Sequence, residues 1–331
     1  MTPLVPLHSR IALILSDVSP VPFCRLTLGE ALGHVLARDL TLPRDLPVQS
    51  QALRAGVAVA ALETVGASPH LPLPLGATAR VKPGDALPAT ADAVQPDEGI
   101  EWIGGTPHTI RALSPGDGIR RTGHDGRAGQ IIARQGERLG PIAALLAAEA
   151  DIQVVETRRP RAQVALDNPA HADFCGRWAR AHGATLSSEA PHLLVRTGHD
   201  HTPRLALTGA ETAWLHRQGE TLVLDLPPRF DGLVAGLLAL GLPVLGALTG
   251  ATRRRVMLPL LRKAASAPGM SDLVLLTAQP AGWQPAAPGL ITITSLAQAD
   301  AFAILPPDSE GLSAGSPLEA TPIFADRSDM S

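Results

Sequence analysis

The sequence predicts a multi-domain protein of the α/β plus β class. At 331 residues the chain is long enough for about two to four domains. After residue 152, short apolar segments alternate with amphipathic helical segments, which is typical of an open α/β sheet. Residues 60–113 and 272–305 instead hold short apolar runs separated by turn residues, and these runs indicate small β domains. Because only 3% of the residues are aromatic, we expect aliphatic cores.

Two segments in the first half of the chain predict helices. Residues 27–30 (TLGE) have the capping-box pattern, and they predict a helix that runs to about Arg38 with one apolar face, formed by Ala31, Leu32, Val35 and Leu36. Residues 141–150 begin with Pro and are rich in Ala and Leu, which predicts a second helix. Between the two, Pro43 and Pro47 indicate an extended connection because Pro does not fit inside a helix.

The second half of the chain predicts strands and helices in alternation. Apolar runs predict strands at 162–166, 192–195 and 222–224, and periodic apolar positions predict helices at 170–182 and 231–240. Residues 253–265 predict a basic helix or strand. Further apolar runs then predict strands at 272–277, 290–294 and 301–305. This order favours an open α/β sheet followed by a small β domain.

Composition argues against several classes of function. The net charge of −3 offers no basic footprint for nucleic acid. We find no apolar run of 18 residues or more and no signal-peptide pattern at the N-terminus, so the sequence predicts no membrane span. Cys24 and Cys175 stand far apart and match no metal spacing, which favours two free thiols in a reducing compartment. We therefore expect a cytoplasmic protein.

Two charged clusters could have a functional role, but a solvent-exposed surface segment is the simpler interpretation of each. His199-Asp200-His201 offers metal-ligand side chains, but neighbouring residues on a strand point to opposite faces, which favours a solvated loop. A phosphate group could bind to Arg253, Arg254 and Arg255. Runs of charged residues usually face water, however, which favours a solvated helix start. The residues themselves therefore predict no metal site.

Residues 114–155 contain a basic, turn-rich loop (IRRTGHD), a Gly-punctuated stretch and an Ala/Leu-rich helical segment. This segment resembles the "IRRxGED … G … L … G … L … A … G" pattern of the molybdopterin molybdenumtransferase family, of the MoeA and gephyrin E-domain type, which inserts molybdate into molybdopterin. Residues 47–59 match that family's "PGFDNSAMDGYAV" at equal length, and residues 80–94 and 295–315 resemble further family segments. Because these segments occur in the family's order, the resemblance covers nearly the whole chain.

The resemblance implies an elongated architecture with four parts. An elongated, discontinuous domain comprises residues 1–46 and 140–160, and a β-rich domain, residues 47–139, is inserted into it. Residues 161–251 form a reduced open α/β domain of the molybdopterin-binding type, shorter than in the family by about one β-α unit, and residues 252–331 form a C-terminal β domain. The resemblance also implies a homodimer, a molybdopterin-type ligand with molybdate and Mg²⁺, and a molybdenum-enzyme partner.

One carboxylate of the family's motifs is retained in the first half of the chain. The acidic residue of "RRxGED" corresponds to Asp125, with Arg120 and Arg121 nearby to bind an anionic ligand. The carboxylate of "SAMDGYA" is replaced by Ala55, whose methyl group can neither bind a metal nor move a proton. After the first α/β strand the family has "STGDEL", and here Asp167 is a displaced substitute.

The second half has lost more of the family's charged groups. The family's "DVVxSSGGVSxGxxD" corresponds to a stretch that begins at His192, in place of an acidic residue. Of the family's double Gly only Gly198 remains; with Arg196 and Thr197 it is a ligand-binding candidate, and Asp200 is a substitute carboxylate. The "KPGKP" loop falls on residues 208–212 (TGAET), where both lysines are absent and Glu211 reverses one charge. The "GLPGNP" turn becomes residues 225–230 (DLPPRF), without the family's Gly and Asn.

Three functional interpretations follow from these residues. The first is an active molybdenumtransferase of divergent sequence. The second is a family member of molybdenum cofactor biosynthesis with weakened or lost catalysis, acting as a molybdopterin-binding or assembly factor for a molybdenum or tungsten oxidoreductase. The third is an unrelated multi-domain α/β protein. The collinear motifs favour the first two, and the lost carboxylates and lysines favour the second over the first.

Overall fold

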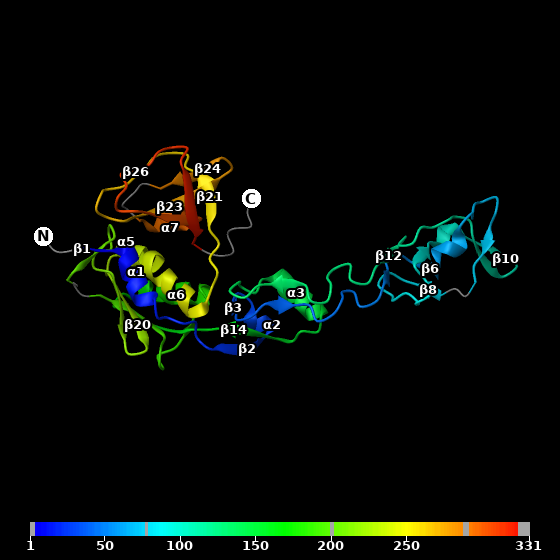
Figure 1. Cartoon of the computed structure of the whole chain (residues 1–331), viewed down its shortest axis with the longest axis horizontal. Coiled ribbons are helices and arrows are strands. Elements are labelled where there is room, and N and C mark those ends of the chain that lie inside the picture. Colours follow the sequence, from blue (N-terminus) through cyan, green and yellow to red (C-terminus); the bar gives the residue numbers. More distant parts are fainter. Residues whose placement is uncertain (1–3, 77–78, 199–201, 287–290, 324–331) are drawn as a thin grey trace. The chain divides into compact units, whose positions relative to one another are not determined.

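The computed structural model describes residues 4–76, 79–198, 202–286 and 291–323. Two compact units make up the chain (Figure 1). The first unit combines Met1–Arg38, Arg134–Pro141 and Val154–Ser331, and the second combines Asp39–Ala133 and Ile142–Gln153. Each unit has hydrophobic clusters of its own, so each can be understood from its own residues. The four-part domain division with its boundaries remains a prediction.

A five-stranded sheet forms the centre of the first unit. The strand order is β16 (Thr185–Leu186), β15 (Arg161–Ala165), β17 (Leu193–Thr197), β20 (Thr221–Leu226) and β19 (Trp214–Gln218). The first four strands are parallel, and β19 is antiparallel to β20. The strands predicted at 162–166, 192–195 and 222–224 are thereby confirmed. The helix predicted at 170–182 is α4 (Pro169–Ala181), which begins where the Asn168 side chain caps two backbone N–H groups.

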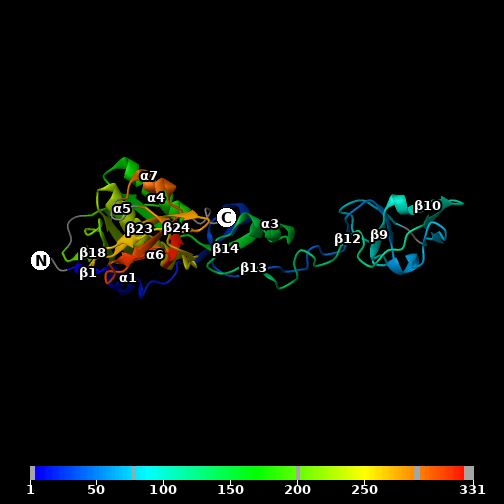
Figure 2. The same ribbon diagram turned by 90° about the horizontal axis from the view of Figure 1, so that it is seen from above.

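A long buried helix crosses this unit and differs from the sequence-based expectation. It consists of α5 (Phe230–Gly236), a π-helical segment (Leu237–Gly241) and α6 (Leu242–Thr249), so it extends well beyond residue 240. The expectation that no apolar run reaches 18 residues was also wrong, because Phe230–Thr249 is long and apolar enough to cross a membrane. However, 83% of its apolar window is buried inside the protein, as in a core helix. Figures 1 and 2 show α1 (Leu7–Leu15) beside α6.

A small antiparallel sheet replaces the helix that was predicted up to Arg38. The capping box at Thr27 and Glu30 is present, but α2 (Leu28–Ala31) ends after one turn. Gly33 then adopts a φ of +76°, which turns the chain into β3 (Val35–Leu36). β3 and β2 (Phe23–Thr27) pair with opposite edges of β14 (Val154–Arg158). Val35 and Leu36 are buried in this sheet and Ala31 is buried at the end of α2, whereas Leu32, predicted on the same apolar face, is 46% exposed.

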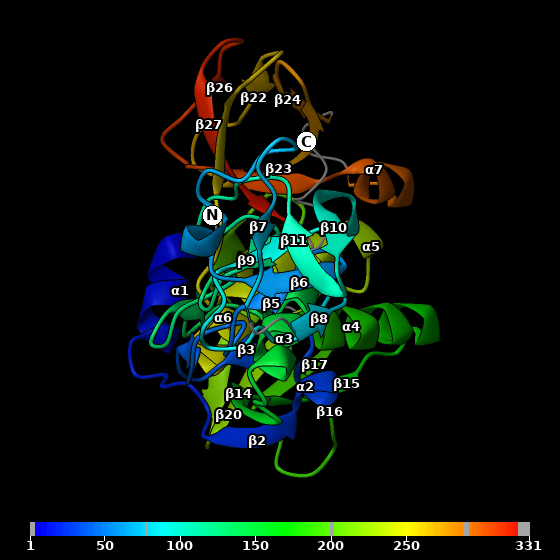
Figure 3. The same cartoon turned by 90° about the vertical axis from the view of Figure 1, so that its right-hand side faces the viewer.

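A second five-stranded sheet, fully antiparallel, occupies the C-terminal part of the first unit (Figure 3). Its order is β21 (Val256–Pro259), β27 (Pro317–Pro322), β25 (Ala301–Leu305), β23 (Asp272–Gln279) and β24 (Gly282–Pro285). Of the segment predicted at 253–265 as a basic helix or strand, residues 256–259 form β21, and the basic residues 253–255 precede it outside any helix or strand, so the expected helix start there was wrong. The strand predicted at 290–294 was wrong, because Thr292 caps α7 (Ile293–Gln298), which packs on β23 (Figure 2). Short pairs complete the unit, β22 (Ala264–Ala265) with β26 (Gly311–Leu312) and β1 (Leu4–Pro6) with β18 (Arg204–Ala206).

The second unit is built from short strands, as the turn-rich sequence predicts. One sheet has the order β8 (Ala79–Val81), β6 (Gly56–Val59), β9 (Ala93–Gln95), and another has β10 (Ile100–Ile103), β11 (Thr106–Thr109), β7 (Leu73–Pro74). Two-stranded pairs join β12 (Ile119–Arg120) to β5 (Gln51–Ala52) and β13 (Ile131–Ala133) to β4 (Leu40–Thr41). Single turns of 3₁₀-helix lie at Ala61–Thr64 and Asp97–Gly99. The helix predicted at 141–150 is α3 (Pro141–Glu149), which mostly belongs to this unit.

Candidate functional site

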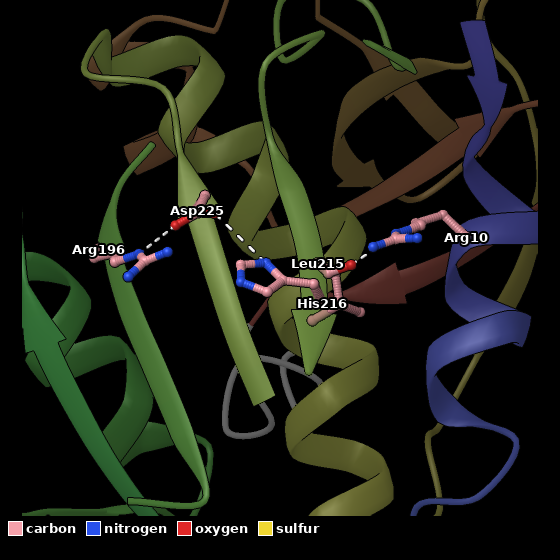
Figure 4. A network of polar contacts seen from close by, with 5 residues as sticks. All are labelled: Arg10, Arg196, Leu215, His216 and Asp225. Atoms are coloured by element: carbon pink, nitrogen blue, oxygen red, sulfur yellow. Dashed lines mark hydrogen bonds and ion pairs between the residues drawn. The ribbon is translucent and has the colours of Figure 1, made fainter. Parts of the chain in front are cut away.

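The carboxyl ends of β15, β17 and β20 carry several of the candidate residues of the first unit. Arg196 and Asp225 are direct neighbours in the parallel ladder between β17 and β20. Arg196 Nε lies 2.6 Å from Asp225 Oδ1, and His216 Nδ1, on β19, lies 3.5 Å from Asp225 Oδ2 (Figure 4). The Asp225 side chain is only 2% exposed. The Arg196 guanidinium therefore compensates the negative charge of Asp225, and this ion pair also occupies the Arg196 side chain.

Thr197 and Gly198 hold the end of β17 against its neighbours. The Thr197 hydroxyl accepts a hydrogen bond from the Asp167 backbone N–H at 3.1 Å, and the Gly198 N–H donates to the Leu226 carbonyl at 2.8 Å. A side chain at position 198 would lie 3.0 Å from Asp225 Cβ, so close packing against Asp225 favours Gly there. Both residues therefore support the sheet edge. Asp200, the substitute carboxylate, lies outside the described residues.

His192 lies at the opposite end of the same strand. It precedes β17, and its ring Nδ1 accepts a hydrogen bond from the Arg161 backbone N–H at 2.9 Å. Burial and the positive charge of Arg161 lower the pKa of His192, which keeps the ring in the neutral form that accepts this bond. His192 therefore joins the amino ends of β15 and β17. Because Arg196 lies toward the other end of β17, the loss of the family's acidic residue at position 192 does not change the charge near Arg196.

The loop at 208–212, where the family has two lysines, is closed in this protein. Burial tends to raise the pKa of Asp272, but hydrogen bonds from the Ser266 hydroxyl and the Ala267 N–H hold it below its usual value. The Glu211 carboxylate accepts a hydrogen bond from the Gly209 N–H at 3.0 Å, within the turn itself. The cavity beside these residues has a volume of about 10 Å³, which is room for about one water molecule. The loop residues thus leave little space for a ligand.

In the second unit, Asp125 is held by its neighbour in the loop. Arg120 contacts Asp125 Oδ1 through Nε at 2.9 Å and through Nη2 at 2.6 Å. The side chains are 44% and 25% exposed respectively, so the pair faces solvent. Arg121 is exposed, and its Nη2 donates to the Pro115 carbonyl at 2.6 Å. The sequence-based candidates Arg120, Arg121 and Asp125 therefore form one loop cluster, in which the retained carboxylate already has a counter-charge.

A pocket of about 780 Å³ opens beside Ala55 in the second unit. Arg54 and Arg111 line it together with Asp97 and Glu98. Asp97 is paired with Arg80 at 3.1 Å, so part of the negative charge of the lining is compensated. This pocket has the size of a small-molecule site and two guanidinium groups, but Ala55 supplies no acid, base or metal ligand to it.

The structure adds residues that the sequence analysis did not single out. Asp225 was interpreted only as a lost Gly of the family turn, and His216 was not considered. The signal was available in part, because an acidic residue that ends an apolar strand needs a partner when it is buried. Arg10 lies on the other side of β19, where its Nε donates to the Leu215 carbonyl at 2.7 Å (Figure 4). Its guanidinium also stacks on the Trp214 ring. It braces the strand that carries His216.

Metal binding finds no support among the side chains that the structure describes. Across the described ranges, no three His, Cys, Asp or Glu side chains converge as they would around a metal ion. The Mg²⁺ that the family resemblance implies therefore lacks a donor set among these residues, and no chemical step is assigned to it. His199-Asp200-His201 falls outside the described residues.

Comparisons with known proteins bear on the same segments. Residues 5–150 match the family model described as "MoeA N-terminal region (domain I and II)". The molybdopterin molybdenumtransferase of Synechococcus elongatus is 29% identical over 161 residues, which span 42% of this chain and 40% of that protein. Molybdopterin molybdenumtransferase 2 of Mycobacterium tuberculosis is 32% identical over 139 residues, 37% of this chain and 34% of its own. The matched part thus spans well under half of each relative.

Solved structures extend the likeness to the whole fold. The crystal structure of a molybdopterin biosynthesis MoeA protein from Pyrococcus horikoshii superposes with a TM-score of 0.73 at 18% identity, over 97% of this chain and 100% of that chain. A second MoeA structure from the same organism gives 0.72 at 20% identity. At this identity the likeness shows the fold, and it confirms the predicted multi-domain α/β plus β architecture. Residues 5–150 thus match the N-terminal region of the MoeA family, and the fold as a whole resembles that of MoeA proteins.

Proposed function

We propose that this protein acts in molybdenum cofactor biosynthesis as a MoeA-type protein whose molybdate-insertion activity is weak or absent. The relatives that it matches are named molybdopterin molybdenumtransferases, which supports the pathway and the ligand class. One observation supports the low activity: the charged candidate residues of the site form ion pairs within the protein. Asp125 is held by Arg120, and Arg196 is held by Asp225.

The pairing matters because catalysis of this kind depends on uncompensated charge. A general base or a ligand for a cation needs an available carboxylate, and stabilisation of a negatively charged transition state needs donors aimed at the ligand. Arg196 instead forms an ion pair of 2.6 Å with the buried Asp225. At two other positions the side chains cannot supply charge of the required sign, since Ala55 is apolar and Glu211 is acidic. Removing one preorganised electrostatic group typically costs about 100-fold or more.

Binding without turnover is the second function that the geometry favours. The pocket beside Ala55 keeps Arg54 and Arg111 and a volume of about 780 Å³, so it suits an anionic small molecule while it lacks a catalytic carboxylate. This arrangement supports a molybdopterin-binding or assembly factor that serves a molybdenum or tungsten oxidoreductase. We also expect a homodimer in the cytoplasm, as the family resemblance implies.

The test has two arms on the purified full-length chain. The first measures molybdate insertion into adenylylated molybdopterin beside a family member that retains the carboxylates and lysines, and we expect a rate lower by about 100-fold or more. The second titrates molybdopterin, and we expect saturable binding. Turnover at the rate of the complete member would overturn the low-activity proposal. Absence of both turnover and binding would reject the ligand class and leave capture of a partner oxidoreductase as the remaining function to measure.

A further inference from the structure

A second pocket, of about 420 Å³, lies in the first unit beside the end of α6. We call it the α6 pocket, and it is defined by six of its lining residues: Arg138, His182, Leu245, Gly246, Arg253 and Ile323. His182 follows the carboxyl end of α4, and β16 begins three residues later. Because α4 returns the chain from the carboxyl end of β15 to the amino end of β16, the α6 pocket lies at the amino ends of the sheet. It is therefore separate from the edge that carries Arg196 and Gly198.

The floor of the α6 pocket is apolar. Leu242 is 7% exposed, Leu245 1% and Ile323 2%, and Pro322 completes the surface between the helix and the end of β27. The volume falls within the range of about 300–1,000 Å³ that is typical of small-molecule sites. Such a floor favours the carbon skeleton of a ligand, because its burial removes apolar surface from water.

Arg253 supplies a charge to this apolar site. Its side chain is half-buried, and within the part of the chain that the structure describes it makes no ion pair or hydrogen bond. The guanidinium rests on Gly246, where a Cβ would come within 2.7 Å of Arg253 Nη2, so Gly246 leaves the room that the cation occupies. Burial and the nearby Arg255 lower the pKa of Arg253 to about 10, so it remains charged at neutral pH. A partly desolvated cation without a counter-ion is costly, and a bound anion would offset that cost.

The other ionisable groups of the pocket are consistent with an anionic ligand. Arg138 donates from Nη1 to the Gly33 carbonyl at 2.7 Å and adds a second positive charge to the lining. Burial lowers the pKa of His182 to about 4, so its ring is neutral at pH 7. Arg254 adds another positive charge, and Glu137 is exposed at the rim. The positive side chains outnumber the acidic one among these residues.

We propose that the α6 pocket binds a small amphipathic organic anion, with its carboxylate or phosphate head on Arg253 and its apolar body over Leu245 and Ile323. The head group and the apolar floor are both required, because neither a free inorganic anion nor a neutral hydrocarbon satisfies both halves of the site. This site is independent of the proposed molybdopterin ligand, since it uses none of the candidate residues Arg120, Arg121, Asp125 or Arg196.

The experiment is a calorimetric titration of the full-length protein with four probes. Octanoate and phenyl phosphate carry an apolar body with a carboxylate or a phosphate head. Inorganic phosphate lacks the body, and octanol lacks the charge. We expect saturable binding of octanoate or phenyl phosphate. We expect binding of inorganic phosphate and octanol to be weaker by at least about tenfold. Equal affinity for all four probes, or no saturable binding of either amphipathic anion at millimolar concentration, would overturn the proposal.

Variants then locate the bound anion. Arg253→Gln should weaken binding of the preferred probe by at least about tenfold, because it removes a charge-assisted hydrogen bond. Arg255→Gln is the matched control, since Arg255 is exposed, is paired with Glu319 at 2.7 Å and does not line the pocket. It should change the affinity by less than about twofold. Gly246→Ala is a second test, because the added Cβ displaces the Arg253 guanidinium. An equal loss in R253Q and R255Q, or full affinity in R253Q, would place the anion elsewhere.

Discussion

Arg196 and Asp225 form an ion pair of 2.6 Å at positions where the family patterns have Ser and Gly. The two residues are register neighbours on β17 and β20, so their side chains extend from the same face of the sheet. Asp225 is 2% exposed, and a carboxylate so deeply buried needs a counter-charge. The two residues therefore depend on each other, and together they add a neutral pair to a sheet edge where the family has two small residues.

We predict that Arg196→Gln lowers the free energy of unfolding by about 2 kcal/mol. The change removes the guanidinium and leaves the His216 ring, whose Nδ1 lies 3.5 Å from Asp225 Oδ2, beside the carboxylate. Breaking a fully buried pair costs about 3–5 kcal/mol, and the loss here is smaller because the Arg196 side chain is 39% exposed. Urea denaturation at pH 7 measures the effect. The double variant with Asp225→Asn should lose less than the sum of the two single changes, by about 1 kcal/mol or more.

Arg177→Gln is the matched control for this stability measurement. Arg177 and Asp173 form an ion pair of 2.9 Å on the surface of α4, with side chains that are 76% and 61% exposed. Such exposed pairs contribute little, so we expect a change below about 0.5 kcal/mol. Equal effects of the Arg196 and Arg177 changes would show that burial of Asp225 has no energetic consequence.

A second prediction concerns Asp125, the retained family carboxylate. Asp125→Asn releases Arg120 from its ion pair, so the guanidinium becomes available to an anionic ligand. We expect molybdopterin to bind about two- to fivefold more tightly, which is the scale of one solvent-exposed ion pair, and we expect no loss of molybdate insertion. Calorimetric titration and the insertion assay measure the two quantities. Asp151→Asn, at another exposed carboxylate of the same unit that pairs with Arg44, is the control.

The opposite outcome for Asp125 has a clear meaning. If the wild-type protein inserts molybdate and Asp125→Asn abolishes that turnover, then Asp125 touches the reacting groups and its pairing with Arg120 does not silence it. Weaker ligand binding in the Asp125 variant would show that the pair as a whole, rather than Arg120 alone, recognises the ligand.

The strands of the central sheet could be predicted because their apolar runs are continuous. β15, β17 and β20 each lie between two neighbouring strands, and β20 is buried along nearly its whole length. β19 was missed, because its polar residues His216, Arg217 and Gln218 hide the strand, which pairs with β20 alone at the edge of the sheet. The helix predicted to Arg38 failed for another reason. Its apolar spacing fits a helix face, but Gly33 breaks the segment.

The candidate site was less predictable because its contacts join distant segments. The loop pair of Arg120 and Asp125 is local, and the sequence placed the two residues together. Arg196 and Asp225 are 29 positions apart in the sequence, and their contact depends on the register between β17 and β20. The periodicity of apolar residues does not predict that register. Substitutions against a family pattern showed which charges were lost, but not that the new residues contact each other.

A third prediction tests the expected homodimer. Ile142 and Leu145 lie three residues apart on α3 and are 76% and 61% exposed, so they present an apolar face without a visible partner among the described residues of their unit. We expect light scattering at micromolar concentration to give twice the chain mass of 34.4 kDa. The double change Ile142→Glu and Leu145→Glu should shift the protein to monomers, because charge in an apolar contact is costly.

The control for the dimer test is Leu62→Glu. Leu62 is 83% exposed in the same unit, but it lies on the 3₁₀ turn at Ala61–Thr64, away from α3 in the sequence. Its change should leave the mass of the assembly unaltered. A wild-type protein that is monomeric at micromolar concentration would refute the dimer, and a dimer that survives the α3 changes would assign the contact to another surface.

The last prediction concerns His182, whose ring is enclosed in the first unit. Nδ1 lies 2.7 Å from the Trp178 carbonyl and Nε2 lies 3.2 Å from the Ile323 carbonyl. Burial lowers the pKa of His182 to about 4; the positive charges of Arg138 and Arg253 act in the same direction, and the two carbonyls oppose it. The native state therefore keeps this ring neutral at pH values where the unfolded chain, with an ordinary pKa of about 6.5, already binds a proton.

Stability should therefore fall as the pH drops from about 6.5 to about 4, and remain at its full value above that window. Between pH 7 and pH 5 we expect a loss of about 2 kcal/mol from this residue, measured by urea denaturation at both values. His182→Gln removes the titrating ring, so its own stability should change less over the same interval by about that amount. His8→Gln, at an exposed histidine of α1, should retain the wild-type pH dependence. A parallel pH dependence of the wild type and the His182 variant would mean that the ring is charged in the native state, and the burial argument would then be wrong.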